Sequence, residues 1–137
     1  MFKSLKVPMT LVRVGSISLI IIASLYLYLG YPYVSKGMFA ANLDLGVSGE
    51  LKAVWFGFCL HLFFIAYLLL ANSRRSSPHK LIVMWCGLIV FADGLLLRGF
   101  LTYKNLVAQA LLISGLLILL GTFWWFQFQR RQDKAPI

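Results

Sequence analysis

At 137 residues the chain has room for one domain, which we expect to cover residues 1–137. Hydrophobic residues make up 61% of it and charged residues only 12%, which excludes a water-soluble domain, because a fold of this size cannot bury so much apolar surface. The formal net charge of +9 does not indicate nucleic-acid binding, since Lys and Arg occur in short clusters between apolar runs. Such clusters are typical of topology signals at an anionic membrane surface. The chain is predicted to be an integral membrane protein.

Residues near the N-terminus predict a retained helix rather than a cleaved secretory signal. A basic start at 1–6 precedes an apolar stretch at 14–34, whereas the core of a signal peptide is only about 7–15 residues long. The two cysteines, Cys59 and Cys86, fall inside apolar runs, where a disulfide framework is not expected. Their spacing does not fit a zinc site either, so we interpret both as small packing residues.

Four segments are long and apolar enough to cross a membrane, which requires about 20 residues. They lie at 14–34, 53–71, 81–103 and 106–127. These segments predict an all-α fold, an integral membrane four-helix bundle.

The breaks between these segments predict how the helices are connected. Pro32 and the polar residues after it are expected to end the first helix, and the residues at 35–49 to form the only substantial loop. Part of that loop is apolar enough to lie along the membrane surface or over the mouth of the bundle. A very short turn at 103–105 makes the third and fourth helices antiparallel neighbours.

The distribution of basic residues predicts that both termini are cytoplasmic. One side of the predicted bundle carries nine of them: Lys3, Lys6, Arg13, Arg74, Arg75, Lys80, Arg130, Arg131 and Lys134. The other side carries four: Lys36, Lys52, Arg98 and Lys104. Aromatic residues, which favour the headgroup level, mark the outer end of the first helix and the inner end of the fourth: Tyr26, Tyr28, Tyr31, Tyr33, Phe123, Trp124, Trp125 and Phe126. We expect a multi-pass protein of the bacterial inner (plasma) membrane.

Ionisable residues inside predicted spans are the candidates for function, because they are costly to bury in a membrane. His61 and Asp93 lie near the middle of the second and third segments, which run antiparallel, so their side chains are expected at similar depth. Facing each other, they would form a hydrogen-bonded pair. On the second helix, Glu50, Val54, Gly57 and His61 form one stripe at helical spacing, and this stripe is expected to face inward with Gly57 permitting close packing.

Three further polar residues extend this cluster toward the outer side. Arg98 either turns inward to Glu50 or extends its side chain outward to the headgroups, and Gln109 lies at comparable depth on the fourth helix. Together with His61 and Asp93 they predict a polar funnel that opens outward, a set of ligand- or proton-binding candidates. Simpler readings remain: Glu50 as a helix cap, and the His–Asp pair as a contact that only holds two helices together.

Small residues predict close helix packing. Gly87 and Gly94 share a face of the third helix, which would admit the fourth helix, the first helix or a second copy of the chain. Serines on the first and fourth helices are interpreted as packing residues in the same way: Ser16, Ser18, Ser24 and Ser114.

One short motif resembles a known family. The run Glu50, Leu51, Lys52, Ala53, Val54 and Trp55 is similar to the opening of the second helix in DoxX-like small four-helix membrane proteins, and the step from Asp93 to Gly94 also looks similar. The resemblance covers residues 45–105. It implies a four-helix membrane module, in some cases associated with quinone-linked oxidoreductases, and it does not identify catalytic residues.

These features favour a non-enzymatic membrane module, either an accessory subunit or a binder of a small lipid-like ligand. No cofactor or metal is implied, and the expected partners are membrane lipids and either further copies of the chain or a larger membrane complex, without nucleic acid. One alternative is a small proton-coupled transporter that uses Asp93 and His61. Another is a membrane enzyme acting on a lipid or quinone, with His61 as the base.

Overall fold

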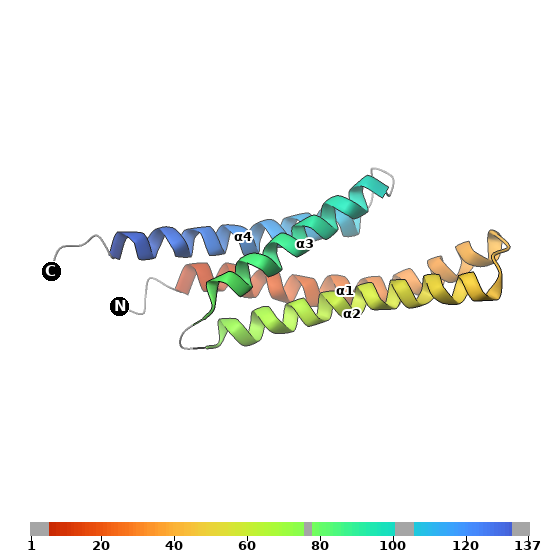
Figure 1. The fold of residues 1–137 in the computed structure, drawn as a ribbon, viewed down its shortest axis with the longest axis horizontal. Helices are drawn as coiled ribbons and strands as arrows, with labels where there is room; N and C mark the ends of the chain where they lie inside the picture. Colours follow the sequence, from red (N-terminus) through yellow and green to blue (C-terminus); the bar gives the residue numbers. More distant parts are fainter. Residues whose placement is uncertain (1–5, 76–77, 101–105, 133–137) are drawn as a thin grey trace.

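The computed structural model describes residues 6–75, 78–100 and 106–132. Within these residues the chain forms four helices in an antiparallel arrangement (Figure 1). Their bounds are α1 Lys6–Ala40, α2 Leu45–Ser73, α3 Lys80–Phe100 and α4 Leu106–Gln132. All four are long and apolar enough to cross a membrane. The predicted all-helical architecture is therefore confirmed at this level.

The junction between α1 and α2 differs from the sequence-based expectation. α1 continues through Pro32 to Ala40, so the predicted loop at 35–49 reduces to a turn at 41–44. A proline removes one backbone hydrogen bond, and a long apolar helix tolerates this loss. The turn is formed by Asn42, whose φ of 50° is left-handed, and by Asp44, whose side chain accepts a hydrogen bond of 2.8 Å from Leu45 N and caps α2.

The helices pack unevenly. α1 packs closely against both α2 and α4, and α4 packs against α3, whereas α2 and α3 touch over only a short length. The start of α1, the end of α2, the start of α3 and the end of α4 share one end of the molecule, which we call the terminal end (Figure 1). From there α3 leans away from α2. At the opposite end the α1–α2 hairpin projects past the α3–α4 hairpin.

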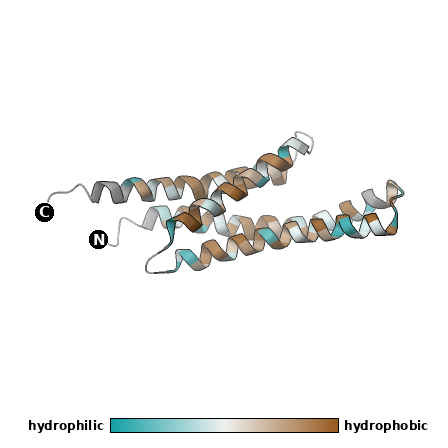
Figure 2. Cartoon of the chain, in the orientation of Figure 1, coloured by the Kyte–Doolittle hydropathy of each residue, from teal (hydrophilic) through white to brown (hydrophobic). Residues whose placement is uncertain are grey.

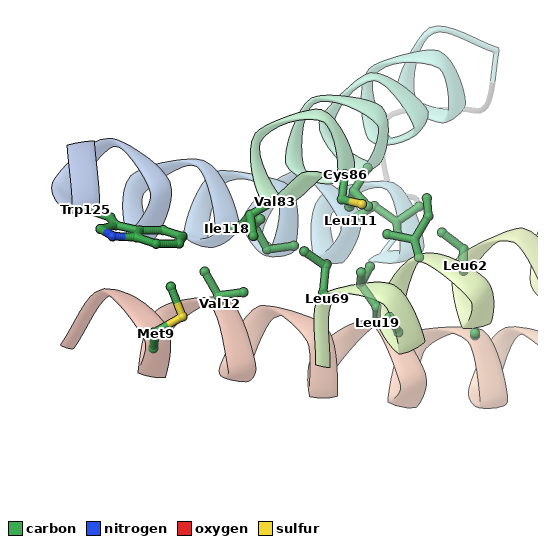
Figure 3. Packing of buried hydrophobic residues seen from close by; sticks show 14 residues of the cluster. Met9, Val12, Leu19, Leu62, Leu69, Val83, Cys86, Leu111, Ile118 and Trp125 are labelled. Carbon is green, nitrogen blue, oxygen red and sulfur yellow. The ribbon is translucent and has the colours of Figure 1, made fainter. Parts of the chain in front are cut away.

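The core follows the three closely packed pairs (Figure 3). Leu19, Leu62, Leu111 and Ile118 have no exposed surface. Large apolar side chains also cover the outside of every helix, and Figure 2 shows hydrophobic colour on most of the described chain. The bundle therefore has apolar surface both inside and outside.

Glycines determine how closely α3 approaches α4. A Cβ added at Gly115 would lie 2.8 Å from Phe91 N, and one added at Gly94 would lie 2.9 Å from Leu112 N. Gly87 faces Ile118 and Leu119 of α4 in the same way. Of the three partners considered for the Gly87 and Gly94 face, the structure selects the fourth helix.

Ser18 and Ser114 form a second packing contact, between α1 and α4, where their hydroxyl oxygens lie 2.7 Å apart. The predicted packing role of these two serines is confirmed. Ser16 is also buried, and its hydroxyl donates to the Val12 carbonyl in its own helix.

Polar contacts hold the terminal end together. Arg13 Nη2 donates to the Ser73 carbonyl at 3.0 Å, which joins α1 to α2. The Asn72 side chain makes two hydrogen bonds with the backbone of His79, accepting from its N–H at 3.0 Å and donating to its carbonyl at 3.1 Å. The Lys80 ammonium group lies 5.4 Å from the centroid of the Trp125 ring, within the range of a cation–π contact between α3 and α4.

Replacing Asn72 with alanine is expected to lower the free energy of unfolding by about 2 kcal/mol, because it removes two partly buried hydrogen bonds, each worth about 1 kcal/mol. Thermal unfolding in mild detergent measures the change. Asn72→Asp is the matched control: it keeps the acceptor for His79 N–H but loses the donor, so a smaller loss is expected. Equal stability of the wild-type protein and Asn72→Ala would contradict a structural role for the two hydrogen bonds between Asn72 and His79.

Candidate functional site

His61 and Asp93 meet between α2 and α3. His61 Nε2 lies 3.3 Å from Asp93 Oδ2, so the contact expected from the positions of these residues in two antiparallel segments is present. Both residues lie well inside the apolar portions of their helices. The pair therefore links two helices that contact each other over a much shorter length than the three closely packed pairs do.

The two side chains differ in exposure. The side chain of Asp93 is 17% exposed, and its Oδ2 is covered by protein atoms, whereas the side chain of His61 is 42% exposed. The contact of 3.3 Å is longer than a charge-assisted hydrogen bond, which is about 2.7–2.9 Å. Asp93 Oδ2 accepts no well-aligned hydrogen bond within the described part of the chain. Part of the hydrogen-bonding capacity of this pair is therefore unused.

A shallow depression surrounds His61 on the outer surface of α2. It measures about 480 Å³ and is lined by Gly57, Leu60, His61, Phe64 and Tyr67. All five come from α2, so the depression is open on the side away from that helix. A small molecule resting there would meet one imidazole in a surface that is otherwise mostly apolar.

The structure does not place Glu50 and Gln109 in a funnel with this pair. Glu50 is exposed near the start of α2 and forms no ion pair with the other described residues. Arg98 is exposed toward the end of α3, and Gln109 is exposed on the first turn of α4. Of the five predicted residues, His61 and Asp93 are the two that the structure brings into contact. Glu50 lies about 16 Å along α2 from His61, and α3, which carries Arg98, leans away from α2 toward this end (Figure 1).

The prediction that the stripe through Val54, Gly57 and His61 faces the inside of the bundle is wrong. Val54 is 71% exposed, and a Cβ added at Gly57 would meet nothing within 4 Å. The face of α2 that points into the bundle instead carries Trp55, Cys59, Leu62, Ala66 and Leu69. α2 is apolar on all sides, so hydropathy does not define which side faces its neighbours. His61 reaches Asp93 from the edge of the exposed face.

Sequence reasoning missed an aromatic cluster on the α1–α2 hairpin. The ring centroids of Tyr26 and Tyr31 of α1 each lie 5.9 Å from that of Trp55 of α2, and Trp55 also contacts Phe56 at 5.0 Å. The tyrosines had been interpreted only as residues at the headgroup level. In an antiparallel hairpin, residues at similar distances from the turn face each other, so the positions of Tyr31 and Trp55 on either side of it were the available signal.

Neither metal ligation nor known relatives identify the site. In the described ranges no three His, Cys, Asp or Glu side chains gather in a way that could hold a metal ion. Comparison with family models, curated proteins and solved structures finds no match for this chain. The resemblance to DoxX-like proteins therefore stays a prediction, and the site is interpreted from its geometry alone.

Proposed function

We propose that this chain is a non-enzymatic protein that crosses the bacterial plasma membrane four times and binds a small lipid-like ligand beside His61 and Asp93. It would act by itself or as an accessory subunit of a larger complex. Large exposed apolar side chains on all four helices support insertion, since lipid would cover them. Arg13, Arg74, Arg75 and Lys80 near the terminal end support a cytoplasmic position for that end.

The observation that carries this proposal is the exposure of His61, one member of an ionisable pair, on the outside of an apolar bundle. A pair that served only to hold α2 and α3 together would gain from having both side chains covered, because an exposed polar group in lipid is costly. His61 is instead 42% exposed and borders the depression on α2. A ligand in that depression could satisfy the imidazole from the lipid side.

The chemistry of the depression favours an amphipathic ligand. His61 can donate or accept a hydrogen bond, depending on its tautomer, and Asp93 can orient the ring from the other side. Leu60 and Phe64 offer apolar surface next to it. A hydroxyl or carbonyl group on an otherwise apolar molecule fits both parts of this surface.

Native mass spectrometry of protein released from mild detergent, with organic extraction of the same sample, tests the proposal. We expect the wild-type protein to retain a small amphipathic molecule and His61→Ala to retain about tenfold less. Such a loss corresponds to about 1.4 kcal/mol, the order of one hydrogen bond to a polar or charged group. Asp93→Asn is expected to cause a smaller loss, because the imidazole remains but is oriented less well.

Gln109→Ala is the matched control, because Gln109 is also polar and exposed but lies on α4. It should leave occupancy unchanged. Equal occupancy in the wild-type protein and His61→Ala, with both folded, would overturn the proposal. A pH-dependent ion flux in proteoliposomes that disappears in Asp93→Asn would instead favour the transporter alternative.

A further inference from the structure

A second groove is lined by residues 24–32 of α1 and by Phe56 and Phe63 of α2. Figure 1 shows these two helices side by side. Its volume is about 520 Å³, and its walls include Ser24, Tyr28, Tyr31 and Pro32 of α1 and Phe56 and Phe63 of α2. The Tyr31 and Phe56 rings meet across the two helices at a tilt of 46°, with centroids 5.9 Å apart. None of these residues lines the depression at His61.

Pro32 gives this groove a polar feature that its apolar lining does not suggest. In an α-helix the carbonyl of residue i accepts a hydrogen bond from the N–H of residue i+4. Proline has no N–H, so the Tyr28 carbonyl loses its usual donor, although α1 continues without interruption to Ala40. Tyr28 and Pro32 both line the groove, and the carbonyl of residue i in a helix points toward residue i+4, so this acceptor is on the side of α1 that borders the groove.

The Ser24 hydroxyl lies one turn before Tyr28 on the same face of α1 and lines the same groove. The groove thus combines aromatic side chains with two polar groups along one edge. In a membrane, where water does not compensate it, a backbone carbonyl without a donor is costly. A molecule that brings a hydrogen-bond donor and an apolar body would satisfy both features.

We propose that this groove binds an amphipathic lipid whose polar end is a hydroxyl group, a membrane alcohol. The hydroxyl donates to the Tyr28 carbonyl, and the apolar body lies against Tyr31, Phe56 and Phe63. The proposal rests on membrane insertion of the α1–α2 hairpin, which is part of the proposed function, but it does not depend on the His61–Asp93 pair. The groove is therefore a ligand site independent of the one at His61.

The test uses the full chain in vesicles of phosphatidylethanolamine and phosphatidylglycerol with two photoactivatable probes. One is hexadecanol with a mid-chain diazirine, and the other is its methyl ether, which has the same chain and an acceptor oxygen but no donor. Peptide mass spectrometry locates the cross-links. We expect the alcohol to label the groove about fivefold more than the ether, the ratio that one hydrogen bond of about 1 kcal/mol gives.

Pro32→Ala is the decisive variant, because alanine restores the N–H that occupies the Tyr28 carbonyl and it favours the helix. The alcohol-to-ether labelling ratio should fall to about one, while labelling by the ether persists. Ser24→Ala should leave the ratio close to its wild-type value. A ratio that survives Pro32→Ala, or that is lost only in Ser24→Ala, would overturn the assignment of the carbonyl as acceptor.

His61→Ala separates this site from the one on α2. It should reduce the ligand retained at His61 without changing the alcohol-to-ether ratio in the groove. Absence of groove labelling by either probe in the wild-type protein would overturn the groove proposal and leave the His61 result standing. Groove labelling with the expected ratio but no ligand at His61 would overturn the proposed function alone.

Discussion

Replacing Gly115 with alanine is expected to lower the free energy of unfolding by about 2 kcal/mol, even though alanine is the better helix former. The added Cβ would lie 2.8 Å from Phe91 N and 2.9 Å from Phe91 Cα. These are backbone atoms, so α3 and α4 must move apart. Overpacking costs about 1–3 kcal/mol, and contact with backbone atoms favours the upper end of this range. The better helix propensity of alanine returns about 1 kcal/mol, which leaves the net loss of about 2 kcal/mol.

Gly99→Ala on α3 is the matched control. A Cβ at Gly99 would meet nothing within 4 Å, so this variant should be as stable as the wild-type protein or up to about 1 kcal/mol more stable. The buried free thiols of Cys59 and Cys86 provide the measurement, because a thiol-reactive fluorophore reports their exposure on heating. An unchanged midpoint for Gly115→Ala would contradict the close approach of α3 and α4.

The sequence predicted the four helices because length and hydropathy alone identify them. It did not predict how each helix is rotated, and the stripe through Val54 and Gly57 shows why. Every face of α2 is apolar, so no polar face marks the outside, and a small residue fits an interface as well as it fits a lipid-facing surface. Gly94 does lie at an interface, whereas Gly57 does not.

The prediction that the first helix ends at Pro32 was wrong for a different reason. Proline is a reliable stop in water, where the freed carbonyl can be hydrated and the chain can turn into solvent. α1 nevertheless continues through Pro32 to Ala40, and Tyr31, the residue just before the proline, contacts Trp55 and Phe56 of α2. A proline removes only one backbone hydrogen bond and fits a long apolar helix, so its presence alone does not locate the helix end.

The candidate site was predictable only in part. The contact between His61 and Asp93 follows from two positions near the centres of antiparallel segments, and the structure brings these side chains together. Glu50 lies eleven residues before His61 on the same helix, which is about 16 Å of helical rise, so it stays apart from this pair. Whether Arg98 of α3 approaches α2 depends on how far α3 leans from it. That angle is set by α3 packing against α4 through Gly94 and Gly115, which is information from outside the site.

The two tryptophans near the terminal end of α4 also show that the sequence does not predict how a helix is rotated. Both Trp124 and Trp125 were expected to anchor the helix at the headgroup level. Trp124 is 54% exposed and fits that role, but Trp125 is only 3% exposed. Trp125 belongs to the same buried cluster as Met9 (Figure 3), and the Lys80 ammonium group lies 5.4 Å from the centroid of its ring. Adjacent residues on a helix point about 100° apart, so one of the two must turn inward when α1 packs on α4.

Trp125→Ala is therefore expected to lower the free energy of unfolding by about 3 kcal/mol, whereas Trp124→Ala should change it by less than about 0.5 kcal/mol. Removal of a buried Trp side chain costs about 3–5 kcal/mol, and the lower value applies because lipid reduces the transfer contribution and leaves the loss of packing. Exposure of Cys59 and Cys86 on heating measures both variants under one condition.

Lys80→Met separates the charge from the packing at this position. It keeps the aliphatic part of the side chain and removes the cation that lies 5.4 Å from the Trp125 centroid and 5.1 Å from the Phe126 centroid. A loss of about 0.5–1 kcal/mol is expected, which is the contribution of a partly exposed cation–π contact.

If Trp124→Ala and Trp125→Ala were equally destabilising, α4 would be rotated from its described position, and the packing of α1 on α4 would have to be revised with it.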